Sequence, residues 1–508
     1  MSVSPIRRMR LRLFLTCWVL FCAHFATDFV REHYLVVAMV EDGTFDLGKY
    51  YGLHEDIFRN PPNAPHQGVH HGANPGISLL AAVPYAVTRP LVDRVVARSL
   101  SARKVDGTDT LAVYDDPRAA RVKFYREARR QGLDVRFGLV GIITMVLCMA
   151  PLSALGVVVL FRLIEGAGVG ERQALWLSLL YAFGTPVLFR TAYLNQNLAI
   201  GVAAAAAFLL LWNPGERLRM ADGRRHVLAG LAAGFGFLCD YSGALALGIL
   251  GLYALARARD TGGWGGALRA GAYYTAGAFP MILALWWYQW AAFGNAILPP
   301  QHWMPKQVIF SDQGYQGVTG PKLQLLLQLL IDSRFGLFIA APLLVLALGA
   351  SLLLRRRHSF LPAREMAVCL GIGVCYLLFF SSIAYTRLQW STGIRYLMPV
   401  VPFLFLPAAA VLLRIPRAAA YLVVVVAVTV SWSMAMVRNQ YGVHTNVMHT
   451  FVEGLQLPWL NTLGKMSAQY APWLEGRPSA LPALLLAAAL VAGIWAIRAP
   501  WRPTIPDA

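Results

Sequence analysis

Charged residues are scarce in this chain of 508 residues, and acidic residues are the scarcest of them. Asp, Glu, Lys and Arg together make up 14% of the sequence, whereas hydrophobic residues make up 57%. Soluble domains carry about 25% charged residues, so this composition excludes a soluble globular protein and is typical of a polytopic membrane protein.

Cysteines are also few, and none is well placed to bridge extracellular loops. The six residues, all within or beside apolar segments, are Cys17, Cys22, Cys148, Cys239, Cys369 and Cys375. Thiols in such segments behave as small hydrophobic groups, so we expect no disulfide framework.

The positive charge is distributed as membrane topology requires. The formal net charge of +19 comes from short Lys and Arg clusters between apolar runs. The positive-inside rule accounts for these clusters, so we expect no nucleic-acid partner. Arg7, Arg8, Arg10 and Arg12 precede the first apolar run without a cleavage pattern after it, which predicts an uncleaved first helix.

Apolar runs long enough, or nearly long enough, to cross a hydrocarbon core of ~30 Å predict about twelve transmembrane helices. These runs start near residues 11, 137, 174, 198, 227, 242, 270, 336, 366, 396, 418 and 481. With both termini in the cytoplasm, the basic clusters fall on that side. We therefore expect an all-α polytopic membrane protein with one membrane domain over residues 1–508. Its Ala- and Arg-rich composition suggests a bacterial inner (plasma) membrane.

The topology places three long loops on the outer, periplasmic side, over residues 28–136, 294–335 and 438–480. The first should contain two helices. The periodicity of Tyr34–Glu41 predicts a short amphipathic helix that stops at Asp42-Gly43. Ile77–Val87 is too short to span a membrane, and Asn74-Pro75-Gly76 before it predicts the start of an interfacial helix.

Acidic residues of the first loop are the best candidates for chemistry. Asp28 and Glu32 are spaced i, i+4 and would share a helix face if the helix begins early. The simpler interpretation is that Asp28 caps the helix and Glu32 lies on a solvated face. Asp240 has an independent case, because an acid near membrane depth is costly and is usually functional or paired.

Several motifs follow one another in a familiar order. They are the first-loop runs from Asp28 to Tyr34, from Ala38 to Phe45, Glu55-Asp56 and from Gly72 to Tyr85, followed by Phe183-Gly-Thr185 with Tyr193, Leu228-Ala-Gly230 with Asp240-Tyr241, Phe293-Gly-Asn295, Arg334-Phe-Gly-Leu337 and the run from Trp390 to Tyr396. Together they resemble the class C (GT-C) glycosyltransferases.

This resemblance implies transfer of a sugar from a polyprenyl-phosphate donor to a glycan, lipid or protein acceptor on the outer side, with inversion at the anomeric carbon. It implies a general base at Asp28, with Asp56 and then Glu32 as the next candidates. Arg31 and Arg395 would contact the phosphate, although Arg395 at a helix end could simply extend to the interface. The implied cavity lining is Tyr34, Tyr193, Asn195, Asp240, Tyr241 and Trp390.

The chain departs from the family pattern at one position. Relatives often have a Lys before the Pro-Gly that opens the interfacial helix, and this chain has Asn74. His70 or His71 would replace that cation, or the phosphate would be held differently. The simplest interpretation is that both belong, with His66, to a plain polar loop. The three could also bind a divalent metal, but we assign no metal ligands, because Pro65 and Gly68 disfavour the helix that would align them.

Two other functions remain open from the sequence. A transporter of a small or lipid-linked solute would explain the helices and Asp240, but would need neither the long acidic first loop nor its position at the outer rim. A non-catalytic assembly protein with a GT-C-like fold would explain the missing Lys.

Overall fold

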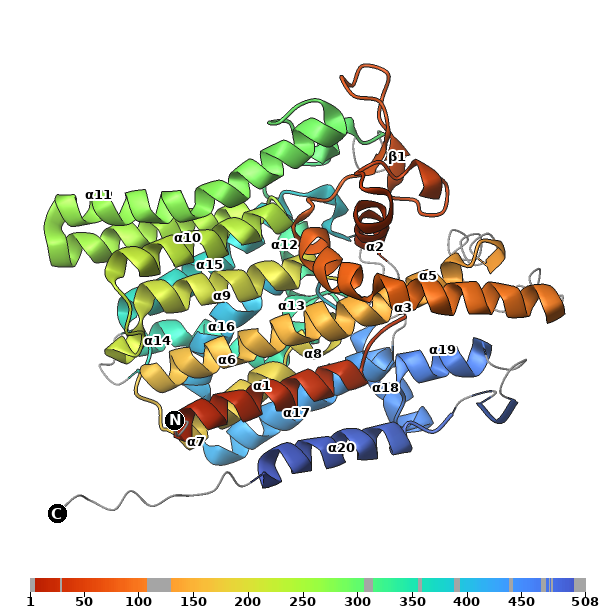
Figure 1. Cartoon of the computed structure of the whole chain (residues 1–508). Helices are drawn as coiled ribbons and strands as arrows, with labels where there is room; N and C mark the ends of the chain where they lie inside the picture. The colour runs from red at the N-terminus through yellow and green to blue at the C-terminus, as the bar shows by residue number, and fades with distance from the viewer. Residues whose placement is uncertain are drawn as a thin grey trace, which may run out of the picture.

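The computed structural model describes residues 5–27, 30–106, 129–305, 314–354, 359–387, 393–437, 442–466, 472–474, 476 and 478–497. The described chain is a bundle of apolar helices. The elements of the first loop, which follows the first helix, lie together at one end of this bundle (Figure 1). Three helical segments are long and apolar enough to cross a membrane, namely Leu133–Gly166, Ala363–Ser381 and Arg417–Met436. The count of about twelve spans stays a prediction.

The main helices of the bundle lie side by side (Figure 1). They are α1 (Pro5–Ala23), α5 (Leu133–Thr144), α6 (Ala150–Gly166), α7 (Glu171–Phe183), α9 (Gln196–Trp212), α10 (Asp222–Cys239), α11 (Gly243–Phe293), α15 (Ala363–Ser381), α16 (Val401–Leu412), α17 (Arg417–Met436) and α20 (Leu481–Ala496). A π-helical segment, η3 (Met145–Met149), joins α5 to α6. The C-terminal α20 packs on α1, where Trp495 Nε1 donates to Thr16 Oγ1 (2.9 Å).

Shorter elements connect these helices. They are α8 (Val187–Arg190), α12 (Leu323–Ile331), α13 (Leu337–Ala340), α14 (Ser351–Leu354), α18 (Val443–Glu453) and α19 (Pro458–Met466), with the 3₁₀ segments η2 (Gly48–Tyr50), η4 (Pro214–Glu216), η5 (Pro300–Trp303), η6 (Pro342–Ala350), η7 (Ala384–Arg387), η8 (Met398–Val400) and η9 (Pro472–Leu474).

Helix α11 is a hairpin of two antiparallel halves. Gly263 has φ 63° and ψ −160°, values that are not helical, and the chain reverses there. Tyr274 from the second half donates its hydroxyl hydrogen to Leu247 O in the first half (2.9 Å). The sequence predicted separate helices that start near residues 242 and 270, and the reversal of the chain at Gly263 agrees with this.

The first loop contains α2 (Arg31–Val37), the π-helical η1 (Ala38–Asp42), a two-stranded antiparallel sheet of β1 (Ile57–Arg59) and β2 (Val69–His71), and the long α3 (Gly76–Asp106). The predicted amphipathic helix ends where expected, at Gly43 in a left-handed conformation (φ 65°), but begins earlier, at Arg31. Residues 28 and 29 lie outside the described residues.

The predicted interfacial helix begins at Gly76, as expected, but its predicted end at Val87 is wrong. Helix α3 continues to Asp106 through Pro84 and Pro90 and projects beyond the end of the bundle (Figure 1). Its distal half is fixed to the start of α5, where Arg103 donates two hydrogen bonds to the Asp134 carboxylate (3.0 and 2.6 Å). This tertiary contact is not visible in local sequence.

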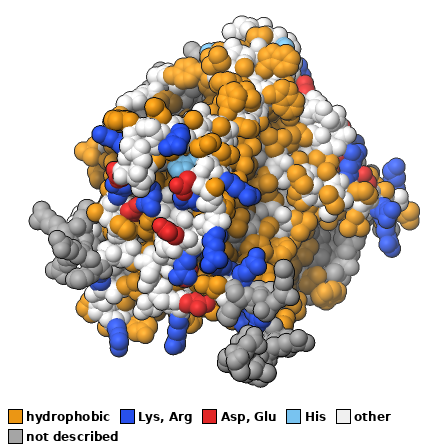
Figure 2. Space-filling view, turned by 60° about the vertical axis from the view of Figure 1, so that its left-hand side comes forward, with side chains coloured by type: hydrophobic (Ala, Val, Ile, Leu, Met, Phe, Trp, Pro, Cys, Tyr) orange, Lys and Arg blue, Asp and Glu red, His pale blue; other side chains and the backbone are white. Residues whose placement is uncertain are grey.

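The surface separates into apolar and basic regions. Figure 2 shows hydrophobic side chains over a broad flank and Lys and Arg side chains gathered on a neighbouring face. Large exposed hydrophobic residues on the bundle include Leu252, Trp264, Leu268, Tyr421, Leu422, Val425, Leu485 and Leu486. Such a surface fits a bundle surrounded by lipid.

Candidate active site

Strand pairing in the first loop brings distant polar residues together. Strand β1 pairs with β2 so that Ile57 lies opposite His71, which places the preceding residue, Asp56, at the same end of the sheet. Arg31, the first residue of α2, approaches both nearby acids. Its Nη1 lies 3.4 Å from Asp56 Oδ2, and its Nε lies 3.3 Å from Glu32 Oε1. We call Arg31, Glu32, Asp56 and His71 the charged cluster.

Both carboxyl groups of the charged cluster are ionised at neutral pH. Burial alone would raise the pKa of Glu32 and of Asp56, but nearby positive charges, that of Arg31 first, outweigh it and lower both pKa values. The two acids differ in access, because the Asp56 side chain is 28% exposed and that of Glu32 only 2%. Asp56 is therefore accessible to a substrate, whereas the buried Glu32 holds the Arg31 side chain in place.

His71 contributes an unsatisfied hydrogen-bond donor. Its ring is fully buried, and Nδ1 accepts a hydrogen bond from the Ala73 N–H (3.0 Å). Burial lowers the pKa of His71 to about 3, so the ring is neutral and its proton is on Nε2. No described residue accepts a hydrogen bond from this buried Nε2. Such an orphaned donor is rare in a folded protein and suits an oxygen atom of a ligand.

His70 faces the opposite side of β2, because successive side chains of a strand point in opposite directions. Its Nδ1 pairs with Asn60 Oδ1 (3.2 Å), and burial lowers its pKa to about 4. It lines a pocket of about 540 Å³ together with Phe45, Asp46, Gln67 and Trp287.

Both histidines are thus neutral at neutral pH. Burial lowers the pKa of both rings, which favours the other expectation, that the phosphate is held without a cation at this position. Their uncharged rings can still donate or accept hydrogen bonds.

Arg395 brings a second guanidinium to the charged cluster from a distant part of the chain. Its charge helps to lower the pKa values of Glu32 and Asp56, and it repels Arg31. Its guanidinium carbon lies 5.4 Å from the ring centre of Tyr396. Among the described residues, none accepts a hydrogen bond from this guanidinium, so its donors are available to a ligand.

Arg190 is a positioning residue that the sequence analysis did not single out. It is buried, hydrogen-bonds to the hydroxyl of Tyr193 and donates to Gly393 O (2.6 Å), which holds the turn that carries Arg395. The segment that contains Arg190 also contacts the chain just after α1, where the Ala26 N–H donates to Ala192 O (2.9 Å). The available signal was an arginine inside an otherwise apolar stretch, which is costly without a role.

The remaining predicted residues are more dispersed. Tyr34 is buried in an aromatic cluster with Tyr50 and Phe137, at ring-centre distances of 5.4 and 4.8 Å, and supports the loop from inside. Asn195 caps α9 by accepting from the Leu198 N–H (3.1 Å). Asp28 and Trp390 lie outside the described residues.

Asp240 and Tyr241 lie where the first loop meets the bundle. Asp240 ends α10 and accepts a hydrogen bond from the Ser242 N–H (2.9 Å), and Tyr241 is hydrogen-bonded by Gln289. The start of α3 contacts the same helix end, because a Cβ at Gly76 would lie 2.7 Å from the Cys239 nitrogen. Only glycine permits this approach.

The divalent metal that the sequence left possible stays a prediction. No group of three or more His, Cys, Asp or Glu residues in the described part of the chain has the arrangement of a metal site. The charged cluster and Arg395 together offer two guanidinium groups, one accessible carboxylate and one imidazole donor.

Comparisons with known proteins return class C glycosyltransferases among solved structures. The chain is similar to ArnT from Cupriavidus metallidurans bound to undecaprenyl phosphate (14% identity, TM-score 0.49, 97% of this chain and 76% of ArnT) and to its apo state (15%, 0.47, 94% and 73%). A weaker similarity is to the apo oligosaccharyltransferase of Archaeoglobus fulgidus (13%, 0.35, 88% of this chain and 59% of that one).

No protein-family model and no curated protein sequence matches the chain.

Proposed function

We propose that this chain is a class C membrane glycosyltransferase that moves a sugar from a polyprenyl-phosphate donor to an acceptor on the outer side of a bacterial inner membrane. The observation that carries the proposal is the approach of Arg31 and Arg395 beside Asp56. Two like charges are held near one another, and one of them has no hydrogen-bond acceptor among the described residues. Such a pair is complementary to a phosphate, which each guanidinium can bind through two N–H groups.

The chemistry follows from this arrangement. Arg31 and Arg395 would bind the donor phosphate and stabilise the negative charge that it gains as the anomeric C–O bond breaks. A carboxylate would accept the proton of the acceptor hydroxyl as its oxygen attacks the anomeric carbon from the opposite side, which inverts the configuration. Asp56 is ionised and accessible, and Asp28 is the other candidate for this base.

The position of the acids favours an enzyme over the transporter considered above. Arg31, Glu32 and Asp56 all belong to the loop between α1 and α5, whereas a transport pathway would place such groups along the interior of the bundle. Asp240 also lies at a helix end, beside the start of α3.

The test is sugar transfer by the purified protein in liposomes, with radiolabelled polyprenyl-phosphate sugars and membrane glycolipid acceptors. Asp28→Asn and Asp56→Asn are compared with Asp42→Asn, a surface acid of the same loop whose one ion pair among the described residues is with Lys49. We expect one of the first two variants to lose transfer while retaining donor binding, and Asp42→Asn to remain active. Solute uptake into sealed vesicles without transfer from any donor would refute the proposal in favour of transport.

A further inference from the structure

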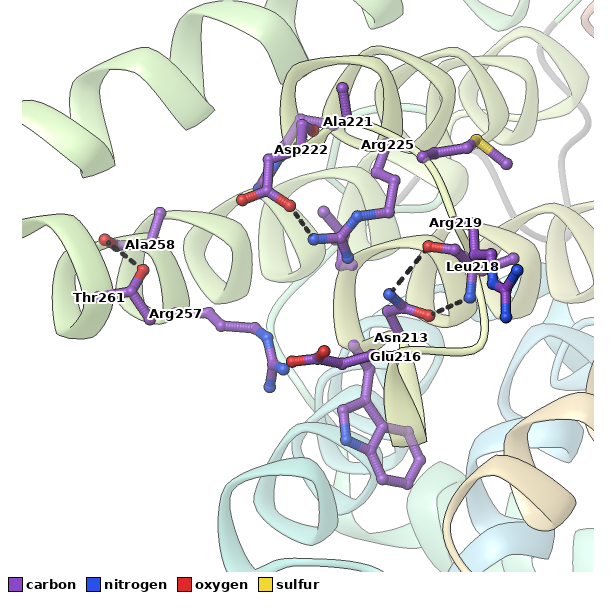
Figure 3. A pocket seen from close by; sticks show the side chains of 14 residues that line it. Asn213, Glu216, Leu218, Arg219, Ala221, Asp222, Arg225, Arg257, Ala258 and Thr261 are labelled. Carbon is purple, nitrogen blue, oxygen red and sulfur yellow. Dashed lines mark hydrogen bonds and ion pairs between the residues drawn. The ribbon is translucent and has the colours of Figure 1, made fainter.

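A second polar pocket lies at the opposite end of the bundle. It has a volume of about 710 Å³ and is formed by the end of α9, the turn η4, the start of α10 and the first half of α11 (Figure 3). Helix α9 follows its cap Asn195 and ends at this pocket, and its 17 residues span about 25 Å. None of the residues that line the pocket belongs to the charged cluster. A ligand here is therefore not the reacting sugar.

This end of the bundle carries the basic residues that the sequence assigns to the membrane boundary. Arg217 and Arg10 both pair with Glu165 there, at 2.8 and 3.6 Å. Because Arg10 belongs to α1, the pocket lies at the end of the bundle where the chain begins. A pocket between helices at this boundary is a typical place for a lipid head group.

Two arginines of the pocket are held in place by the protein. Arg225 pairs with Asp222 and donates to Leu210 O (3.1 Å), and Arg257 pairs with Glu365 (3.2 Å). The Arg257 side chain remains 40% exposed, so it keeps donors that face the pocket. Fixed side chains lose little entropy when a ligand binds.

Two further charged side chains line the pocket, those of Arg219 and Glu216. Among the described residues, none forms an ion pair with Arg219 or Glu216, although both line the pocket (Figure 3). Glu216 has φ 54°, a left-handed conformation that is uncommon for this residue type. A free cation and a free anion three residues apart are complementary to a ligand that carries both signs.

We propose that this pocket binds the phosphoethanolamine head group of a membrane phospholipid. Arg219 and Arg257 contact the phosphodiester, and the Glu216 carboxylate accepts hydrogen bonds from the ammonium group. The acyl chains continue over exposed apolar side chains beside the pocket. Tyr273 is 48% exposed and approaches the start of α10 at Gly223, and Met220 is 36% exposed on the pocket wall.

Other head groups satisfy this pocket less well. Phosphatidylglycerol has no ammonium group, so it leaves Glu216 unpaired and adds repulsion. Phosphatidylcholine has an ammonium group without N–H donors. The site should therefore bind phosphatidylethanolamine more tightly than either of the other two lipids. This preference does not depend on the proposed transferase activity.

The experiment is native mass spectrometry of the delipidated full-length protein, titrated separately with the three phospholipids of identical acyl chains. We expect phosphatidylethanolamine to bind the wild type about tenfold more tightly than the other two, the effect of one charge-assisted hydrogen bond. Glu216→Gln should abolish this preference, and Arg219→Gln should weaken the binding of all three lipids. Soluble phosphoethanolamine tests the source of the head group and should bind far more weakly than the lipid.

Matched controls separate the site from general lipid binding. Arg224→Gln and Glu171→Gln remove exposed charges that do not line the pocket, and both should leave lipid preference unchanged. Equal binding of the three lipids to the wild type would overturn the proposal. So would an equal effect of Arg224→Gln and Arg219→Gln, or soluble phosphoethanolamine binding as tightly as the lipid.

Discussion

Arg31 Nη1 and Asp56 Oδ2 lie 3.4 Å apart, although 25 residues separate them in the sequence. The contact forms because α2 presents Arg31 at its first position while β1 begins immediately after Asp56. Arg31 therefore pairs with Asp56 and Glu32 at the same time. A substitution of one residue in the charged cluster should change the charge environment of the others.

Arg31→Gln should destabilise the first loop by about 3 kcal/mol, because it leaves the buried Glu32 carboxylate without its cation. Thermal unfolding of the purified protein measures this loss. The double variant with Glu32→Gln should recover much of it, since no unpaired charge then remains buried. An equally low melting temperature for the double variant would contradict the assignment.

The pKa values of Glu32 and Asp56 are lowered from ordinary values of 4.5 and 3.8, which fixes the direction of a pH effect. Their stabilisation is fully present above those ordinary values and is lost as pH falls through the lower folded-state values. Transfer should therefore show no acid limb from Asp56 between pH 5 and 8. In Arg31→Gln the acid limb should move upward, and a kcat/KM profile against pH measures it.

Arg395→Lys should raise KM for the polyprenyl-phosphate donor by about tenfold or more, since a lysine cannot make the two parallel hydrogen bonds of a guanidinium. The measurement is initial rate against donor concentration. Arg387→Lys, a neighbouring arginine on η7, is the matched control and should leave KM unchanged. An unchanged KM in Arg395→Lys would exclude Arg395 from phosphate binding.

Arg103→Met should weaken the attachment of α3 to α5 by about 3 to 5 kcal/mol, because the Asp134 side chain is only 4% exposed and would lose the guanidinium that pairs with it. Hydrogen exchange should show faster exchange in the distal half of α3. The double variant Arg103→Met with Asp134→Leu should restore the slow exchange in the distal half of α3. If the single variant exchanges like the wild type, this pair does not hold the helix.

Features specified by short segments were predictable from the sequence. Gly43 ends the first loop helix, Gly76 begins α3 and Gly263 turns α11 back on itself, since each depends on glycine or on its immediate neighbours. The end of α3 was not predictable, because a contact of Arg103 with Asp134 carries the helix past two prolines. Local signals do not contain such partners.

The candidate site was predictable in its residue types but not in its arrangement. Arg31, Glu32, Asp56 and His71 were all candidates, and the pairing of two three-residue strands that gathers them is too short to leave a periodic pattern. The neutral state of His70 and His71 depends on burial, which the sequence of a loop does not reveal. Arg190 acts through Gly393, more than 200 residues away.

Strand β2 places His70 and His71 on opposite faces, so this one strand separates two groups of polar residues. His71 belongs to the charged cluster, and His70 belongs to the pocket with Asp46 and Trp287. A ligand that displaces either imidazole shifts the same peptide unit. A substitution that moves this strand should therefore disturb the charged cluster and the pocket together.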